Sequence, residues 1–286
     1  MVASPGTATP PFLESVWGNI CIIGFNNVLV GLLVFAITGE CSVLLLVPIV
    51  TSAACSLAMG LDYYQAAYDH PARIDVALEV FKSLAWLIQE AGLPFYSYAL
   101  VTRILRGHKR VVFLVLFWAI MVVVTITKAL MIVYSCQYHL HSQIFSAAFD
   151  RHVHVGYYVA IALVECVGAW FLLRNFYAGL QLSRSSPLRD SKFYRHLIRS
   201  TEFRVVMMIA FFGICRTVTY SFRSSFRSFE GWHNIAGQLD LLVGTLLDLF
   251  PFVLFIDILA SRLVFAQESI TRCNNLRVSN SDASVD

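Results

Sequence analysis

Charged side chains inside long apolar stretches are the residues of this sequence that could do chemistry. A charge at the centre of a bilayer costs about 2.5–3.5 kcal/mol on insertion scales, so such residues usually face the interior of a helix bundle and have a role there. Those that we expect to border one polar cavity are Glu79, Lys82, Glu90, Lys128, Glu165, Arg216, Asp240 and Asp248. Carboxylates outnumber cations in this set, so at least one acid lacks an ionised partner and is expected to hold a proton at neutral pH.

Expected depth in the membrane suggests roles for these residues. Glu90, Glu165 and Asp248 are expected near the midplane, and Glu79 and Asp240 near the outer boundary. A protonated acid in such a site is a candidate general acid, so the candidate catalytic residues are Glu90, Asp248, Glu165, Asp240 and Glu79. The candidate substrate-binding residues are Trp86, Tyr96, Lys82, Arg216 and Asn27. The alternative is that the charges only pair with one another and hold the helices together.

Residues 76–105 carry the largest share of these polar groups, and the spacing places them on one side of a helix. At 100° per residue, an arc of about 120° holds the polar side chains, which are Glu79, Lys82, Ser83, Gln89 and Glu90. Phe81 and Leu84 lie on other sides of the same helix. We therefore expect the polar arc to face protein, with Glu79 and Lys82 paired as neighbours three residues apart.

Aromatic residues are the second chemical feature, because Phe, Tyr and Trp make up 14% of the chain. An aromatic face stabilises a desolvated cation by about 0.5–2 kcal/mol. Aromatic residues that the sequence places around the polar arc include Trp86, Phe95, Tyr96, Tyr98, Trp118, Tyr157 and Tyr158. A protonated acid surrounded by aromatic faces is what a carbocation cyclase needs. For any single aromatic residue, a lipid-facing or interfacial position is the simpler explanation.

The elements that must position these residues are seven apolar stretches separated by short polar loops. A bilayer core about 30 Å thick needs about 20 apolar residues to cross it as a helix. The candidate spans are residues 20–37, 42–60, 76–105, 111–134, 155–177, 203–221 and 238–265. With 58% hydrophobic residues and a mean hydropathy of +0.68, the chain is predicted to be an all-α polytopic membrane protein, a bundle of seven transmembrane helices.

Domain organisation and orientation follow from the same pattern. Residues 1–16 are expected to be a disordered N-terminus outside, residues 17–268 the transmembrane domain, and residues 269–286 a disordered cytosolic tail. Lys and Arg number four in the loop after the third span, seven after the fifth and three in the tail, against four on the opposite side. This bias predicts a lumenal or outside N-terminus and a cytosolic C-terminus, in the endoplasmic reticulum or another endomembrane.

Several classes of function are disfavoured by the sequence. The net charge of +3 requires no nucleic-acid partner, since basic loops are topology signals. No nucleotide-binding or hydrolase motif is present, so we expect no cofactor. Two pairs of histidines, at 139/141 and 152/154, are better explained by a solvated loop than by a metal site, and none is predicted. The last span has no lysine for a retinal Schiff base, and no common receptor signature is found.

Several stretches resemble a group of seven-helix integral membrane proteins of filamentous fungi. They are residues 82–90 with 96–98, residues 199–204, residues 216–221, and residues 238–240 through 257–262, and the resemblance covers about two thirds of the chain. Some small fungal membrane proteins of this kind are terpene cyclases that make meroterpenoids from epoxidised prenyl chains. The Trp-Glu signature of the best-known such cyclases is absent here, so the resemblance transfers no catalytic residue.

These observations favour a membrane-embedded terpene cyclase of fungal secondary metabolism, an isomerase or lyase whose reaction begins with a proton. Glu90 or Asp248 would give the proton, and Glu165 or Asp240 would take up the last one. The expected partners are a lipophilic small-molecule substrate and membrane lipids, and the sequence indicates no protein partner. A seven-helix receptor for a small ligand and a small-molecule transporter are the alternatives.

Overall fold

The computed structural model describes residues 11–39, 42–141, 147–185, 208, 210–211, 213–219, 221, 235 and 237–260. All regular structure in these residues is helical, as predicted. A short 3-10 turn, η1 (Phe12–Glu14), comes first. The helices that follow are α1 (Val16–Thr38), α2 (Val43–Ala67), α3 (Ala72–Ile104), α4 (His108–His141) and α5 (Ala147–Ser185). We call the helix that contains residues 213–219 the sixth helix, and Gly237–Ala260 the seventh helix.

Five of these helices are long and apolar enough to cross a membrane by length and composition: α1, α2, the seventh helix and the central parts of α4 and α5. Charged residues keep α3 out of this group, yet its 33 residues extend about 50 Å at 1.5 Å per residue. Its two glutamates, Glu79 and Glu90, are buried, whereas Phe81 is 65% exposed. The chain is therefore a multi-pass membrane protein in a lipid environment, and the predicted helical membrane bundle is confirmed.

Predicted and observed boundaries differ most at α5, which spans Ala147–Ser185 instead of residues 155–177, and α2 also runs past its expected end. Its expected end was residue 60, but the helix continues to Ala67. At the N-terminus, η1 lies within residues 1–16, which were expected to be disordered. Phe12 packs edge-on against Tyr63 of α2, with ring centroids 4.9 Å apart, and the Ser15 hydroxyl accepts a hydrogen bond from the Gly18 amide at 3.0 Å. This contact and this helix cap give residues 11–16 a defined structure.

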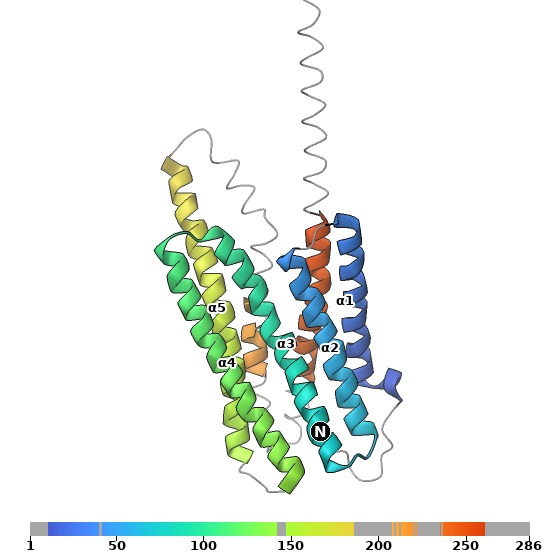
Figure 1. The fold of residues 1–286 in the computed structure, drawn as a ribbon. Coiled ribbons are helices and arrows are strands. Elements are labelled where there is room, and N and C mark those ends of the chain that lie inside the picture. Colours follow the sequence, from blue (N-terminus) through green and yellow to red (C-terminus); the bar gives the residue numbers. More distant parts are fainter. Residues whose placement is uncertain are drawn as a thin grey trace, which may run out of the picture.

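α3 is the central helix of the bundle. Figure 1 shows it between the α1–α2 pair and the α4–α5 pair, with consecutive helices antiparallel. The largest apolar core fills the space between α3, α4 and α5 around Val101, Phe113, Phe117 and Tyr157. A central position for the most polar helix explains how its charged groups reach partners on both sides.

Small residues bring α1, α2 and α3 close together. A Cβ on Gly24 of α1 would meet the Ser56 hydroxyl and the Ser52 carbonyl of α2. A Cβ on Gly92 of α3 would overlap the Thr51 methyl of α2. Such close approach is typical of helix packing in membranes, where small residues allow tight van der Waals contact. Thr51 and Gly92 therefore mark the place where α2 and α3 lie against each other.

Candidate functional site

The polar arc of α3 faces protein, as predicted. Its buried members are Glu79, Ser83, Gln89 and Glu90, each less than a tenth exposed. Phe81 and Leu84 face outward toward the lipid. Because water is absent from the bilayer core, each buried group depends on neighbouring helices for its hydrogen bonds.

Glu90 is the centre of an ion-pair network in the middle of α3. Its Oε1 lies 2.9 Å from Nη2 of Arg216 on the sixth helix, and its Oε2 lies 3.9 Å from Nζ of Lys128 on α4. The Tyr158 hydroxyl of α5 donates to Oε1 at 3.2 Å. These four residues, the Glu90 network, connect four helices. Two cations and one hydroxyl group thus contact a single carboxyl group, and charge-assisted contacts of this kind are stronger than neutral hydrogen bonds.

Two tyrosine rings lie against the two cations of this network. Lys128 Nζ lies 5.0 Å from the centre of the Tyr157 ring, and the Arg216 guanidinium lies 5.3 Å from that of Tyr158. Both are cation–π distances. These aromatic faces therefore stabilise the protein's own charges, which the sequence did not indicate.

A second polar group, the outer cluster, lies between α2 and α3 and consists of Asp62, Gln65, Glu79, Lys82 and Trp86. Lys82 Nζ lies 2.5 Å from Glu79 and 3.2 Å from Asp62, and it donates to Gln65 Oε1 at 2.9 Å. The Trp86 indole donates to Asp62 at 3.2 Å. The predicted pairing of Glu79 with Lys82 is thus confirmed. Lys82 and Trp86 were expected to bind substrate, but they form ion pairs and hydrogen bonds within this cluster.

Sequence reasoning missed Asp62 and Gln65 because the second span was expected to end at residue 60. The signal that could have found them is their spacing of three, which continues one face of the preceding apolar helix. The structure also separates the residues that were expected to border one cavity. Only Glu90, Arg216 and Asp248 of that set line the polar cavity described next.

The polar cavity lies between α1, α2, α3, the sixth helix and the seventh helix. Its volume is about 20 Å³, and a cavity holds a water molecule once it exceeds roughly 10–15 Å³. The residues that line it are Gly24, Thr51, Ser52, Cys55, Gln89, Glu90, Leu93, Arg216, Leu247, Asp248 and Pro251. It can therefore accommodate one small polar group in contact with two carboxylates and a guanidinium.

Asp248 differs from Glu90 in its surroundings. The Gln89 amide donates to Asp248 Oδ1 at 2.6 Å, and the Cys55 thiol lies beside the same carboxyl group. Asn27 Nδ2 donates to the Asp248 backbone carbonyl at 2.7 Å. The neighbouring carbonyl, of Leu247, lacks its usual helical donor because Pro251 has no amide hydrogen. Among the residues that the structure describes, no Lys or Arg lies within ion-pair distance of Asp248.

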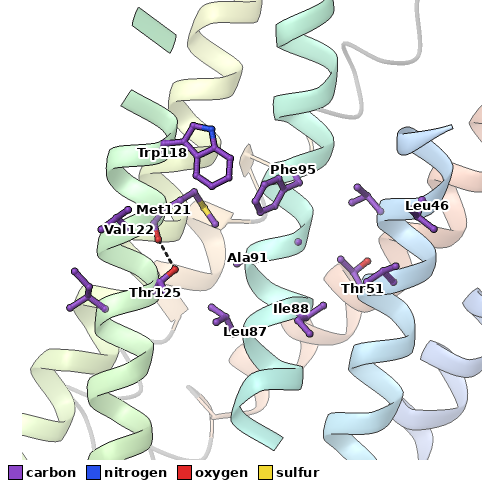
Figure 2. Close-up of a pocket in the computed structure, with 14 residues that line it drawn as sticks. Leu46, Thr51, Leu87, Ile88, Ala91, Phe95, Trp118, Met121, Val122 and Thr125 are labelled. Atoms are coloured by element: carbon purple, nitrogen blue, oxygen red, sulfur yellow. Dashed lines mark hydrogen bonds between the residues drawn. The ribbon is translucent and has the colours of Figure 1, made fainter. Parts of the chain in front are cut away.

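An apolar lateral groove lies on the opposite side of the α2–α3 contact. Figure 2 shows it between α2, α3 and α4, with Thr51, Ile88, Phe95 and Trp118 among its walls. Its volume is about 560 Å³, within the range of about 300–1,000 Å³ typical of small-molecule sites. Ile88 and Trp118 are about half exposed, so the groove opens sideways to the lipid. Thr51 lines both the lateral groove and the polar cavity.

The remaining predicted site residues lie away from both cavities. Tyr96 is 1% exposed and packs in the core against Phe250 and Leu254, rather than facing a site. Asp240 accepts a hydrogen bond from the Thr219 hydroxyl at 3.3 Å. Glu165 of α5 is buried with its carboxylate against Gly213 of the sixth helix, and its Oε2 has no hydrogen-bond partner among the described residues.

Most of the aromatics expected around the polar arc pack against one another instead. Tyr98 contacts the rings of Phe113 and Phe117 on α4, which were not among the expected residues, and the three rings form a chain with centroids 4.6–6.1 Å apart. Phe95 and Trp118 extend this chain to the lateral groove, with their own centroids 5.9 Å apart. Only these last two therefore offer surface to a bound molecule in the lateral groove.

No protein-family model, no curated protein and no solved structure matches this chain.

Proposed function

We propose that this chain is a membrane-embedded terpene cyclase that uses a proton to cyclise a lipophilic prenylated or epoxidised substrate. The observation that carries the proposal is the position of Thr51, which forms a wall of both the lateral groove and the polar cavity. A prenyl chain could enter the lateral groove from the bilayer without crossing water. Its reactive end would lie at Thr51, beyond which are the Glu90 and Asp248 carboxyl groups of the polar cavity.

Asp248 is the acid in this proposal, in preference to Glu90. A general acid needs a carboxyl oxygen that is available to pass a proton to the substrate, and ion pairs occupy both oxygens of Glu90. Arg216 and Lys128 both face Glu90, whereas Asp248 receives only neutral donors among the described residues. Glu90 would then supply a fixed charge that keeps Arg216 in place.

The proposed reaction is an isomerisation. The Asp248 carboxyl proton passes to the epoxide oxygen, the carbon–oxygen bond breaks, and the alkene electrons form the new carbon–carbon bond. The cation that results loses a carbon-bound proton. Because Glu165 and Asp240 line neither cavity, we propose that the Asp248 carboxylate, freed by the first transfer, takes up this proton, so that product and substrate have equal mass.

The lateral groove supports this chemistry through what lines it. Phe95 and Trp118 present aromatic faces, which stabilise a cation by about 0.5–2 kcal/mol each when water is excluded. Thr51 and Thr125 are its hydroxyl residues, and their hydroxyls donate to the backbone carbonyls of Pro48 and Met121. Little in the lateral groove would therefore quench a carbocation before ring closure.

We also propose a place in the cell for this activity. The distribution of Lys and Arg supports a lumenal N-terminus and a cytosolic C-terminus in the endoplasmic reticulum or another endomembrane. The resemblance to fungal membrane proteins supports a role in secondary metabolism. Tags at both termini test the orientation: protease added to sealed microsomes should remove a C-terminal tag and spare an N-terminal one, and the reverse result would contradict it.

Feeding the expressing host with aromatic compounds that carry an epoxyfarnesyl chain tests the activity. The expected result is a cyclised product of unchanged mass, absent from a host that carries the empty vector. The Asp248→Asn variant should accumulate in the membrane and give no such product. If the parent consumes none of these compounds, the cyclase proposal is wrong.

A receptor for a lipophilic ligand is the second candidate, because the Glu90 network joins four helices through two buried ion pairs and the Tyr158 hydrogen bond. Such networks can hold a bundle in one of two arrangements. A receptor would bind ligand in the lateral groove without changing it, and Asp248→Asn would leave ligand affinity within about twofold of the parent. Binding of an epoxyfarnesyl compound that is recovered unchanged would favour this candidate.

A further inference from the structure

Two buried polar atoms beside the polar cavity have no hydrogen-bond partner among the described residues. They are Ser52 Oγ of α2 and Gln89 Oε1 of α3, and both residues line the cavity. Ser52 is 2% exposed and Gln89 is 6% exposed, so neither atom reaches bulk water. An unsatisfied buried polar group is destabilising, so this pair indicates a molecule that is present when the protein functions.

The other polar groups at the cavity already have partners. Thr51 donates to the Pro48 carbonyl at 3.1 Å, Asp248 Oδ1 accepts from the Gln89 amide nitrogen, and Glu90 accepts from Arg216. What remains is an amide oxygen, which can only accept, and a serine hydroxyl, which can donate or accept. A group that satisfies both must itself donate one hydrogen bond and take part in a second.

We propose that the polar cavity is a binding site for a single hydroxyl group, which donates to Gln89 Oε1 and accepts from Ser52 Oγ. An ether, an epoxide or a carbonyl oxygen has no proton to give to Gln89. An ammonium group would bring three donors, whereas the two unpaired atoms at the cavity call for one donor and one further hydrogen bond. The volume of about 20 Å³ suits one oxygen atom with its proton.

The ligand that brings this hydroxyl group is a lipophilic alcohol. Its chain lies in the lateral groove and its oxygen passes Thr51, the residue that both cavities share. The inference rests on the proposed function only for the isoprenoid nature of the chain. Opening an epoxide also produces a hydroxyl group, so the same two atoms would hold the oxygen of the proposed product. A bound water molecule is the other source of a hydroxyl group.

Binding of farnesol, of farnesyl methyl ether and of the hydrocarbon farnesane to the purified full-length protein in detergent separates these sources. Farnesol should bind about tenfold more tightly than the ether, since the ether leaves Gln89 Oε1 unpaired. The hydrocarbon should bind no better than the ether. If water alone occupies the cavity, farnesol and its ether will bind equally, and the proposal is overturned. Absence of farnesol binding to the parent also overturns it.

Ser52→Ala should reduce the preference for farnesol over the ether from about tenfold to threefold or less. Gln89→Met is the second variant and should have the same effect, in case Ser52→Ala folds poorly. Ser97→Ala is a matched control: its hydroxyl is also buried and unpaired among the described residues, but Ser97 lies against Gly168, away from both cavities. This control should keep the tenfold preference, and a Ser52→Ala variant that also keeps it overturns the proposal.

Turnover gives an independent result. If the parent protein prefers farnesol but cyclises no epoxide, the hydroxyl-site proposal stands and the cyclase proposal is wrong. If the parent protein cyclises an epoxide but binds the alcohol and the ether equally, the cyclase proposal stands and the hydroxyl-site proposal is wrong.

Discussion

The outer cluster and the polar cavity lie on the same side of α3 but differ in how their polar atoms are satisfied. In the outer cluster, Lys82 contacts Asp62, Glu79 and Gln65, and Trp86 donates to Asp62. The polar cavity lies about two turns further along α3. Among the described residues it contains one carboxyl group with no Lys or Arg within ion-pair distance and two buried atoms without hydrogen-bond partners. Both regions hold helices together, and the polar cavity also has room for one small group.

This difference indicates where a charge has a structural role and where it could act on a ligand. Polar groups that satisfy one another fix a helix pair and leave nothing for a substrate to bind. Buried groups without partners are destabilising, so they persist in a protein when a ligand or a reaction compensates for them. The outer cluster therefore serves as a control region for every substitution at the polar cavity.

The largest expected contrast compares two amide substitutions. Asp248→Asn should reduce cyclisation by about 10²–10⁴-fold, because general acid catalysis contributes that much and the amide cannot give the proton. Glu79→Gln removes a charge from the outer cluster and should leave turnover within about threefold of the parent, since Glu79 lies off both cavities. Product formation is measured by mass spectrometry and normalised to protein in the membrane. Equal losses in the two variants would remove the distinction between the regions.

The second contrast concerns stability at the two cations. Arg216→Met leaves Glu90 buried with only Lys128, 3.9 Å away, and breaking a buried ion pair costs about 3–5 kcal/mol. Lys82→Met should cost less, about 1–3 kcal/mol, because the Asp62 side chain is 24% exposed and can reach water. The thermal unfolding midpoint of the protein in detergent should fall further for Arg216→Met. A larger fall for Lys82→Met would show that the outer cluster is the stronger connection.

Periodicity predicted the helices and the inward face of α3 because both depend on one repeating pattern. The positions of Glu79 and Glu90 on a common face follow from 3.6 residues per turn, and burial confirms that face. The partners that these residues have on other helices were not predicted from the sequence. Glu90 pairs with Arg216, and Asp248 pairs with Gln89. These pairings depend on how the helices rotate and cross, which a hydropathy pattern does not encode.

The division into two polar regions was not predicted for a related reason. A count of charges in the membrane treats all of them as one set, whereas the bundle separates them by depth along α3. Asp62 was assigned to a loop, so the pairing of Lys82 with α2 was not expected. The lateral groove was also missed, because it depends on Gly92 and Ala91 leaving space between larger side chains of three helices.

The smallest expected contrast concerns the wall between the lateral groove and the polar cavity. In Gly92→Ala, the new Cβ would overlap the Thr51 methyl, and overpacking of this kind costs about 1–3 kcal/mol. Gly60→Ala is the matched control in α2 near the outer cluster, where a Cβ meets nothing within 4 Å. That variant should be neutral or slightly stabilising, since Ala favours a helix by up to about 1 kcal/mol over Gly. Thermal unfolding of the purified variants gives both values.

Removing the Thr51 methyl group tests whether that contact causes the loss. Thr51→Ala in the Gly92→Ala background should restore most of the unfolding midpoint, because the clashing atom is gone, and the two changes should be non-additive by about 0.5–3 kcal/mol. In the parent background, Thr51→Ala opens the wall and should tighten farnesol binding if the hydroxyl group passes at this point. Additive effects of the two substitutions would show that Gly92→Ala acts elsewhere, and unchanged farnesol affinity in Thr51→Ala would mean that the two cavities do not communicate beside Thr51.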